Sequence, residues 1–211
     1  MIAHGEVAPA DRDLAASAEL LIAADGGALA LERWGLLPHL VVGDLDSLGR
    51  ERAAALAANG AMVKRFPAAK DQSDLELALR DALESGANDI VLLGIFGGAR
   101  IDHALVNATL LADPAYRGRG LRAVLGATQV RALHASDVIA LRGPVESIVT
   151  IIPLRGDATG VRTRGLRYRL NGDALPFGKS LGLSNVVESL PASVSMSTGI
   201  ALVIEIEGGG T

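Results

Sequence analysis

Two carboxylates stand close together at the exit of an apolar run, in the stretch 40-LVVGDLDSLG-49. The run before Gly43 predicts a buried strand, and Asp44 and Asp46 follow it directly. Like charges this close repel each other unless a cation compensates them. The stretch therefore indicates either a cation-binding strand exit or an acidic turn that begins a helix before Leu48.

Aspartates recur at the ends of three further predicted strands, in 24-ADGGA-28, 70-KDQSDLELAL-79 and 97-GGARIDH-103, as Asp25, Asp71, Asp74 and Asp102. The carboxyl ends of parallel strands meet at one edge of a sheet, and ligands bind there. Hard oxygen ligands without any thiolate favour Mg²⁺, which pairs a few carboxylates with substrate phosphates. The sequence therefore predicts a magnesium site at this edge.

Glycines and cations accompany these aspartates. Glycine lets a backbone approach a phosphate, and the same strand ends carry Gly26, Gly27, Gly43, Gly97 and Gly98. Lys70 and Arg100 can supply positive charge to phosphates. No GxxxxGK[ST] motif occurs. The set predicts a magnesium–nucleotide site that is not a P-loop.

The elements that must position these residues alternate along the first part of the chain. Predicted strands cover 19–24, 39–42, 61–66, 89–96, 121–125 and 129–133, and predicted helices cover 28–34, 50–58, 74–85 and 102–111. Ser73 and Glu76 form an S-x-x-E capping box, which marks the start of the helix 74–85. The alternation predicts an α/β fold of Rossmann-like type, a parallel sheet with helices on both faces.

The pattern changes after about residue 135. Short β-type runs at 138–141, 147–153, 166–170 and 201–206 are separated by turn signals, among them 171-NGD-173. This pattern is typical of a small all-β sandwich. We therefore expect an α/β domain over 1–135 that carries the magnesium–nucleotide site, and a β-sandwich domain over 136–211.

Composition excludes several classes of protein. The 211 residues are 49% hydrophobic, carry a net charge of −4 and include no cysteine. The charge disfavours a nucleic-acid binder, and the lack of cysteine excludes disulfides and thiolate metal sites. No signal peptide and no membrane-spanning stretch is evident. We expect a soluble cytoplasmic protein without a nucleic-acid or membrane partner.

Four motifs in order resemble those of the thiamine pyrophosphokinase family of bacterial type. They are 24-ADGGA-28, 43-GDLDS-47, 70-KDQSDLELAL-79, with Ser73 where the family has Thr, and 97-GGARIDHALVN-107. Ala99 departs from the family, which usually runs GGR directly. In the second part, 151-IIPLRGDATGVRTRGLRYRL-170 and 183-LSN-185 look like the signatures of the family's β-domain, with Tyr168 where eukaryotic relatives carry Trp.

The resemblance implies an enzyme that transfers the pyrophosphoryl group of ATP to the hydroxyl of thiamine and yields AMP and thiamine diphosphate. It also implies Mg²⁺ and a homodimer. In such dimers, thiamine binds between the first domain of one chain and the β-domain of the other.

On this basis we assign roles to individual residues. Asp44, Asp46 and Asp71 are the predicted Mg²⁺ ligands, and Asp74 is predicted to orient or deprotonate the substrate hydroxyl. The predicted catalytic set is completed by Arg100, which contacts phosphates, and Asp102. The predicted nucleotide contacts are Asp25, Gly26, Gly27, Gly43, Lys70, Gly97, Gly98 and His103, with Asn107 as a brace. The predicted thiamine contacts, besides Asp74, are Tyr168, Ser184 and Asn185.

Several other functions share parts of this pattern. Asp44 and Asp46 also fit the D-x-D motif of metal-dependent glycosyltransferases, which leaves KDQSDLELAL unexplained. They fit a haloacid-dehalogenase phosphatase motif less well, because Leu48 stands at its last position. A pyrophosphokinase acting on a hydroxymethylpterin would differ only in its acceptor pocket. A non-catalytic nucleotide-binding protein is the remaining alternative.

Overall fold

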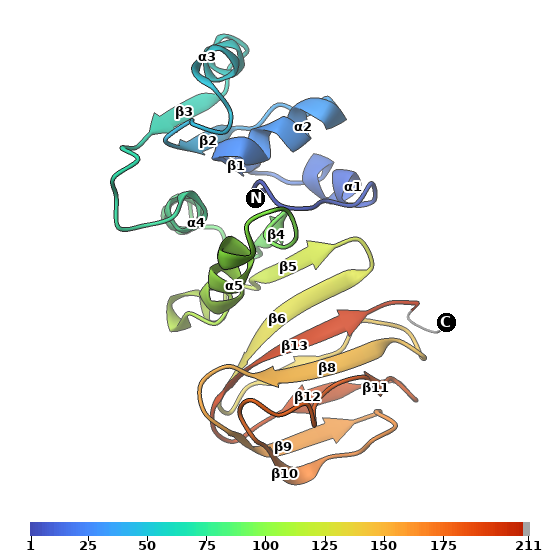
Figure 1. Ribbon diagram of the computed structural model, residues 1–211. Coiled ribbons are helices and arrows are strands. Elements are labelled where there is room, and N and C mark those ends of the chain that lie inside the picture. Colours follow the sequence, from blue (N-terminus) through green and yellow to red (C-terminus); the bar gives the residue numbers. More distant parts are fainter. Residues whose placement is uncertain (209–211) are drawn as a thin grey trace. The chain divides into compact units, whose positions relative to one another are not determined.

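The computed structural model describes residues 1–208 and divides the chain into two compact units (Figure 1). The first unit comprises Met1–Leu110 and Gly118–Gly126, and the second comprises Leu111–Arg117 and the chain from Ala127 onward. The predicted boundary at residue 135 lies beyond β6 (Thr128–His134), which pairs with β13 (Ile200–Ile206) of the second unit. That the first domain binds the nucleotide and the second binds thiamine stays a prediction.

The first unit is built on parallel strands. β1 (Ile22–Ala24), β2 (Leu40–Gly43) and β3 (Met62–Arg65) pair in parallel, and so do β4 (Val91–Leu93) and β5 (Arg122–Leu125). Ile2 forms parallel bridges with Ala23 of β1 and Leu93 of β4, so the N-terminal segment lies between these two strands. Sequence reasoning did not assign this segment to the sheet.

Helices alternate with these strands as predicted. They are α2 (Ala28–Trp34), α3 (Arg50–Ala58), α4 (Asp74–Glu84) and α5 (Ile101–Leu110), with α1 (Asp11–Ala16) and the 3₁₀ turn η1 (Asp25–Gly27) in addition; a second 3₁₀ turn, η2 (Pro114–Tyr116), belongs to the second unit. The predicted cap of α4 is confirmed, because the Ser73 hydroxyl accepts a hydrogen bond from the Glu76 backbone N–H at 3.2 Å. The buried Leu75, Leu79 and Ala82 give α4 an apolar face, and the helix packs against β1 and β2.

The second unit consists of antiparallel strands in two groups. One group has the order β10 (Asn171–Leu175), β9 (Ala158–Arg164), β12 (Ser193–Ser195) and β7 (Val138–Ala140). The other has the order β11 (Asn185–Val186), β8 (Ile148–Pro153), β13 and β6. Both contribute to one apolar core, which includes Leu133, Val149, Val161, Val194 and Val203. The predicted fold class, a parallel α/β part followed by an antiparallel all-β part, is confirmed.

Two local predictions in the second unit are wrong. The predicted strand 166–170 is irregular except for one bridge between Leu166 and Val187, and the predicted turn 171–173 opens β10. The strand β9 was missed because its exposed positions are arginines and its interior contains Gly160, a turn signal. Among the described residues, no helix is long and apolar enough to cross a membrane.

Candidate functional site

A cavity of about 820 Å³ lies in the first unit, next to the carboxyl ends of β1, β2 and β4. The predicted site residues that line it are Asp25, Gly26, Asp44, Asp46, Asp74, Gly97, Gly98, Arg100, Asp102, His103 and Asn107. Segments far apart in the sequence therefore meet where the parallel sheet predicts. A cavity of this size accommodates a small-molecule ligand.

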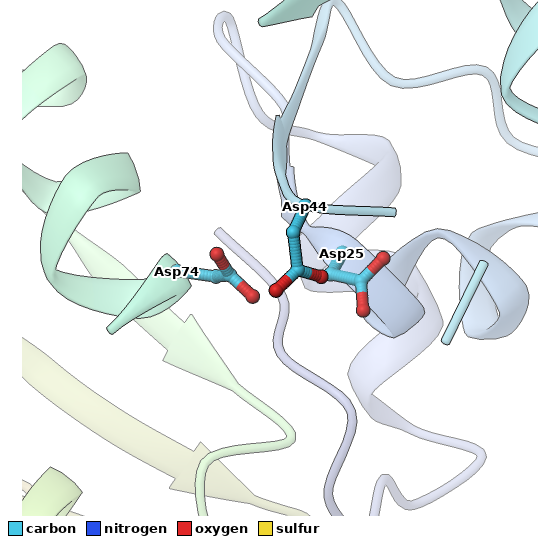
Figure 2. A group of neighbouring side chains, drawn as sticks. All are labelled: Asp25, Asp44 and Asp74. Carbon is cyan, nitrogen blue, oxygen red and sulfur yellow. The ribbon is translucent and has the colours of Figure 1, made fainter. Parts of the chain in front are cut away.

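Three carboxylates form the acidic cluster of this cavity: Asp25, Asp44 and Asp74. Each offers one oxygen, and the three oxygens lie within 4.8 Å of one another. Figure 2 shows Asp44 between the other two, with Asp25 at the start of η1 and Asp74 at the start of α4. Three ionised carboxylates at these separations repel one another, so the acidic cluster favours a cation.

Asp25 joins the first strand exit to the second. Its side chain is buried, and its two carboxylate oxygens accept hydrogen bonds from the backbone N–H groups of Ser47 (3.1 Å) and Leu48 (3.2 Å). Burial raises the pKa of Asp25, while the hydrogen bonds from Ser47 and Leu48 act in the opposite direction. Asp25 therefore anchors the turn that carries Asp44.

The geometry of that turn separates Asp44 from Asp46. Leu45 between them adopts a left-handed backbone conformation with φ +70°. The Asp46 backbone N–H donates to Asp44 Oδ1 at 3.1 Å, and the Ser47 hydroxyl donates to Asp46 Oδ1 at 3.1 Å. The hydrogen bond from Ser47 is the main cause that lowers the pKa of Asp46. Asp46 is exposed and lines the cavity, but it does not belong to the acidic cluster.

Glycine at position 43 is required by the carboxylates themselves. A Cβ at Gly43 would lie 2.8 Å from Cβ of Asp25 and 3.1 Å from Cγ of Asp74. Gly27 is required by another neighbour, since a Cβ there would overlap the carbonyl oxygen of Ile2. We predicted that glycines at these strand ends let a phosphate approach the backbone. At Gly43 and Gly27, contacts with neighbouring protein atoms already require glycine, whether or not a phosphate binds.

Lys70 places its ammonium against the acidic cluster. Its Nζ lies 3.0 Å from Asp74 Oδ1 and 3.5 Å from Asp44 Oδ2. Burial lowers the pKa of Lys70, but its interactions with the carboxylates of Asp74 and Asp44 outweigh it and hold the pKa above its ordinary value. The lysine is therefore fully charged at neutral pH.

The predicted set of metal ligands differs from the acidic cluster. Of Asp44, Asp46 and Asp71, only Asp44 belongs to it. Among residues 1–208, Asp71 neither lines the cavity nor belongs to the acidic cluster. Its side chain is exposed, and it precedes the residue that caps α4. The other two members of the acidic cluster are Asp25 and Asp74, to which we assigned other roles.

Arg100 and Asp102 pair with each other at the rim of the cavity. Arg100 Nε donates to Asp102 Oδ1 at 2.9 Å, and Nη2 donates to Oδ2 at 2.6 Å. The guanidinium holds the pKa of Asp102 well below its usual range. Both side chains are exposed, so a ligand anion can compete for the guanidinium. Asn107 is buried and donates to the carbonyl oxygen of Ile95 at 2.8 Å, which fastens α5 to the loop after β4.

Sequence reasoning missed several cavity-lining residues, among them His4 and Gly5. These two lie in the N-terminal segment that the sheet incorporates through Ile2. Nothing in the stretch MIAHGEV has the spacing of a motif, so their only signal was proximity to a strand that was not predicted.

The predicted residues of the second unit form a local arrangement around Tyr168. The Asn185 side chain is buried; its Oδ1 accepts from the Tyr168 N–H (3.0 Å) and the Val186 N–H (2.9 Å), and its Nδ2 donates to the Tyr168 carbonyl (2.7 Å). Tyr168 itself is 65% exposed. Ser184 adopts φ +56°, and its backbone N–H donates to Thr150 Oγ1. Asn185 thus holds the backbone of Tyr168, and the Tyr168 ring is available for a ligand.

We expect Asn185→Ala to lower the free energy of unfolding by about 2–3 kcal/mol, because it leaves partly buried backbone groups of Tyr168 and Val186 without these partners. Urea denaturation of the full chain measures the change. Ser184→Ala is the matched control, since it keeps the backbone hydrogen bond to Thr150, and its expected loss is about 0.5 kcal/mol or less. Equal losses in the two variants would contradict the assignment.

Comparisons with known proteins cover both parts of the chain. The sequence model of the thiamin pyrophosphokinase catalytic domain matches residues 12–125, and that of the thiamin pyrophosphokinase vitamin B1 binding domain matches residues 138–201. A thiamine pyrophosphokinase of Bacillus subtilis is 28% identical over 185 residues, which cover 88% of this chain and 86% of that protein.

Solved structures are similar over almost the whole chain. The crystal structure of the Bacillus subtilis thiamine pyrophosphokinase superposes with a TM-score of 0.82 at 27% identity and covers 98% of both chains. That of a thiamin pyrophosphokinase from Geobacillus thermodenitrificans superposes with a TM-score of 0.81 at 26% identity and covers 99% of this chain and 97% of the other.

Proposed function

Because the chain belongs to the thiamine pyrophosphokinase family, we propose that the cavity of its first unit binds ATP with Mg²⁺ at the acidic cluster. The activity is ATP-dependent pyrophosphorylation of thiamine, which yields thiamine diphosphate and AMP. The observation that carries the proposed site is the convergence of Asp25, Asp44 and Asp74 from three strand exits in the region that matches the catalytic domain.

The residues of the acidic cluster fit a magnesium ion. They offer three carboxylate oxygens within 4.8 Å, and Asp74 Oδ1 is buried and lacks a well-directed hydrogen bond. We assign Asp44 and Asp74 as the direct ligands, since both oxygens of Asp25 already accept backbone hydrogen bonds. When bound there, Mg²⁺ would neutralise charge on the polyphosphate and polarise the β-phosphorus.

The other side chains of the cavity supply positioning and proton transfer. Asp25 fixes the turn of Asp44, and Arg100 exchanges Asp102 for a phosphate oxygen. Two carboxylates line the cavity outside the acidic cluster, Asp46 and Asp102, and Asp102 is paired with Arg100. We therefore assign Asp46 to accept the proton of the attacking hydroxyl. Asp74, to which we first gave that role, is committed to the cation. Holding the hydroxyl in line with the β-phosphorus accounts for much of the acceleration in such a reaction.

The second unit is proposed to hold thiamine through Tyr168. The exposed phenol ring can stack on a pyrimidine or thiazolium ring, and Asn185 keeps its backbone in place. We further propose a cytoplasmic homodimer with thiamine at the subunit interface. This rests on the family resemblance and on exposed apolar side chains near Tyr168 in the sequence, namely Phe177, Leu181 and Leu183.

Incubation of the full chain with ATP, Mg²⁺ and a candidate alcohol tests the reaction. We expect AMP to form with thiamine and not with a hydroxymethylpterin. AMP formed only with the pterin would overturn the acceptor, and ADP or free phosphate would indicate a kinase or a phosphatase. Ligand-dependent melting without any product would indicate a non-catalytic binding protein.

A further inference from the structure

We infer that Lys70 is an internal counter-ion of the acidic cluster. When metal and nucleotide bind together, its ammonium moves from the carboxylates to the polyphosphate. The inference rests on the proposed magnesium–nucleotide site and concerns the order in which that site is filled. The observation behind it is the position of one ammonium between two carboxylates of the acidic cluster.

The Lys70 ammonium lies against the two carboxylates that would bind a metal ion, those of Asp44 and Asp74. Lys70 Nζ approaches Asp74 Oδ1 at 3.0 Å and Asp44 Oδ2 at 3.5 Å, and only about 15% of the Lys70 side chain is exposed. Magnesium binds oxygens at about 2.0–2.1 Å in a strict octahedron, and one oxygen cannot serve a metal and an ammonium in the same direction. A magnesium ion held by the two oxygens that contact Lys70, Asp44 Oδ2 and Asp74 Oδ1, therefore requires Lys70 to move.

The contact between Lys70 and Asp74 is suited to exchange. Although the two atoms lie 3.0 Å apart, Asp74 Oδ1 receives no well-directed hydrogen bond from any residue that the structure describes. The two groups form an ion pair of opposite charges, and a second cation can take the place of the ammonium in it. Lys70 also lies in the irregular segment 67–73, between β3 and the cap of α4. Its four-carbon side chain can turn without moving a strand or a helix.

Displacement of Lys70 by metal alone is unfavourable, because the ammonium would lose two carboxylate partners and gain none. A polyphosphate in the cavity changes this balance, since its oxygens accept the displaced ammonium. Metal and nucleotide therefore assist each other, and free metal binds weakly in the absence of nucleotide.

Titration calorimetry of the full chain with Mg²⁺ alone, and with Mg²⁺ plus α,β-methylene-ATP, tests the inference in Lys70→Met. Removal of the competing ammonium is expected to tighten the binding of Mg²⁺ alone by about tenfold or more. The same change is expected to weaken binding of the magnesium–nucleotide analogue by about tenfold, because a phosphate partner is lost. A merely structural role for Lys70 predicts no gain of metal affinity.

Arg65→Met is the matched control for a general charge effect. Arg65 pairs in register with Gly43 across β2 and β3, is exposed, and makes no ion pair with any described residue. Its removal is expected to change the affinity for Mg²⁺ alone by about twofold or less. Equal gains in the two variants, or no gain in Lys70→Met, would overturn the inference. Failure of wild type to bind the nucleotide analogue in a magnesium-dependent way would instead overturn the proposed site.

Discussion

Asp44→Asn is expected to lower kcat for AMP formation by about a thousandfold and to leave the free energy of unfolding within about 1 kcal/mol of wild type. The amide removes a charged ligand from the centre of the acidic cluster, where Asp44 faces both Asp25 and Asp74. It keeps the side-chain oxygen that accepts the Asp46 N–H. Relief of repulsion within the acidic cluster offsets loss of the contact with Lys70, so the fold is little affected.

Asp71→Asn is the control variant for this prediction. Asp71 is an exposed aspartate outside the acidic cluster, in the motif that carries Asp74, so its substitution is expected to change kcat by about threefold or less. Steady-state AMP formation at saturating Mg²⁺ and urea denaturation measure both variants. A loss at Asp71 as large as that at Asp44 would restore the ligand set Asp44, Asp46 and Asp71.

Asp25→Ala is expected to have the second large effect, and here activity and stability fall together. The substitution leaves the backbone N–H groups of Ser47 and Leu48 without their acceptor, and Leu48 is buried. Loss of two hydrogen bonds to a carboxylate costs about 3–5 kcal/mol. Once the turn is released, Asp44 is no longer held against Asp74, and we expect kcat to fall by about a hundredfold or more.

The two measurements for Asp25→Ala are urea denaturation and AMP formation at a temperature where the variant is folded. Asp13→Asn, at an exposed aspartate of the same unit, is the control and is expected to match wild type in both. Full activity in a destabilised Asp25→Ala variant would show that the turn of Asp44 does not depend on Asp25.

The location of the site could be predicted because it follows from the topology. Apolar runs that end in glycine and aspartate identify the strand exits, and a parallel sheet places these exits at one edge. The cap at Ser73 fixed the start of α4 and hence the position of Asp74 on its first turn. This reasoning needs only the order of elements along the chain.

The choice of ligands could not be predicted in the same way. The left-handed backbone of Leu45 separates Asp44 from Asp46, although both follow the same strand. Asp25 is turned toward a loop more than twenty residues away, which no local pattern indicates. The N-terminal segment enters the sheet through Ile2 and explains Gly27, yet it is too short to show a strand period. Such details depend on tertiary contacts that local sequence patterns do not encode.

The most direct test of the account is the anomalous scattering of Mn²⁺ in crystals of the full chain grown with α,β-methylene-ATP. The account predicts a manganese peak bound by Asp44 and Asp74 beside Asp25, with the Lys70 ammonium on the polyphosphate. A manganese ion held by Asp46 and Asp71 and remote from Asp25 and Asp74 would contradict it.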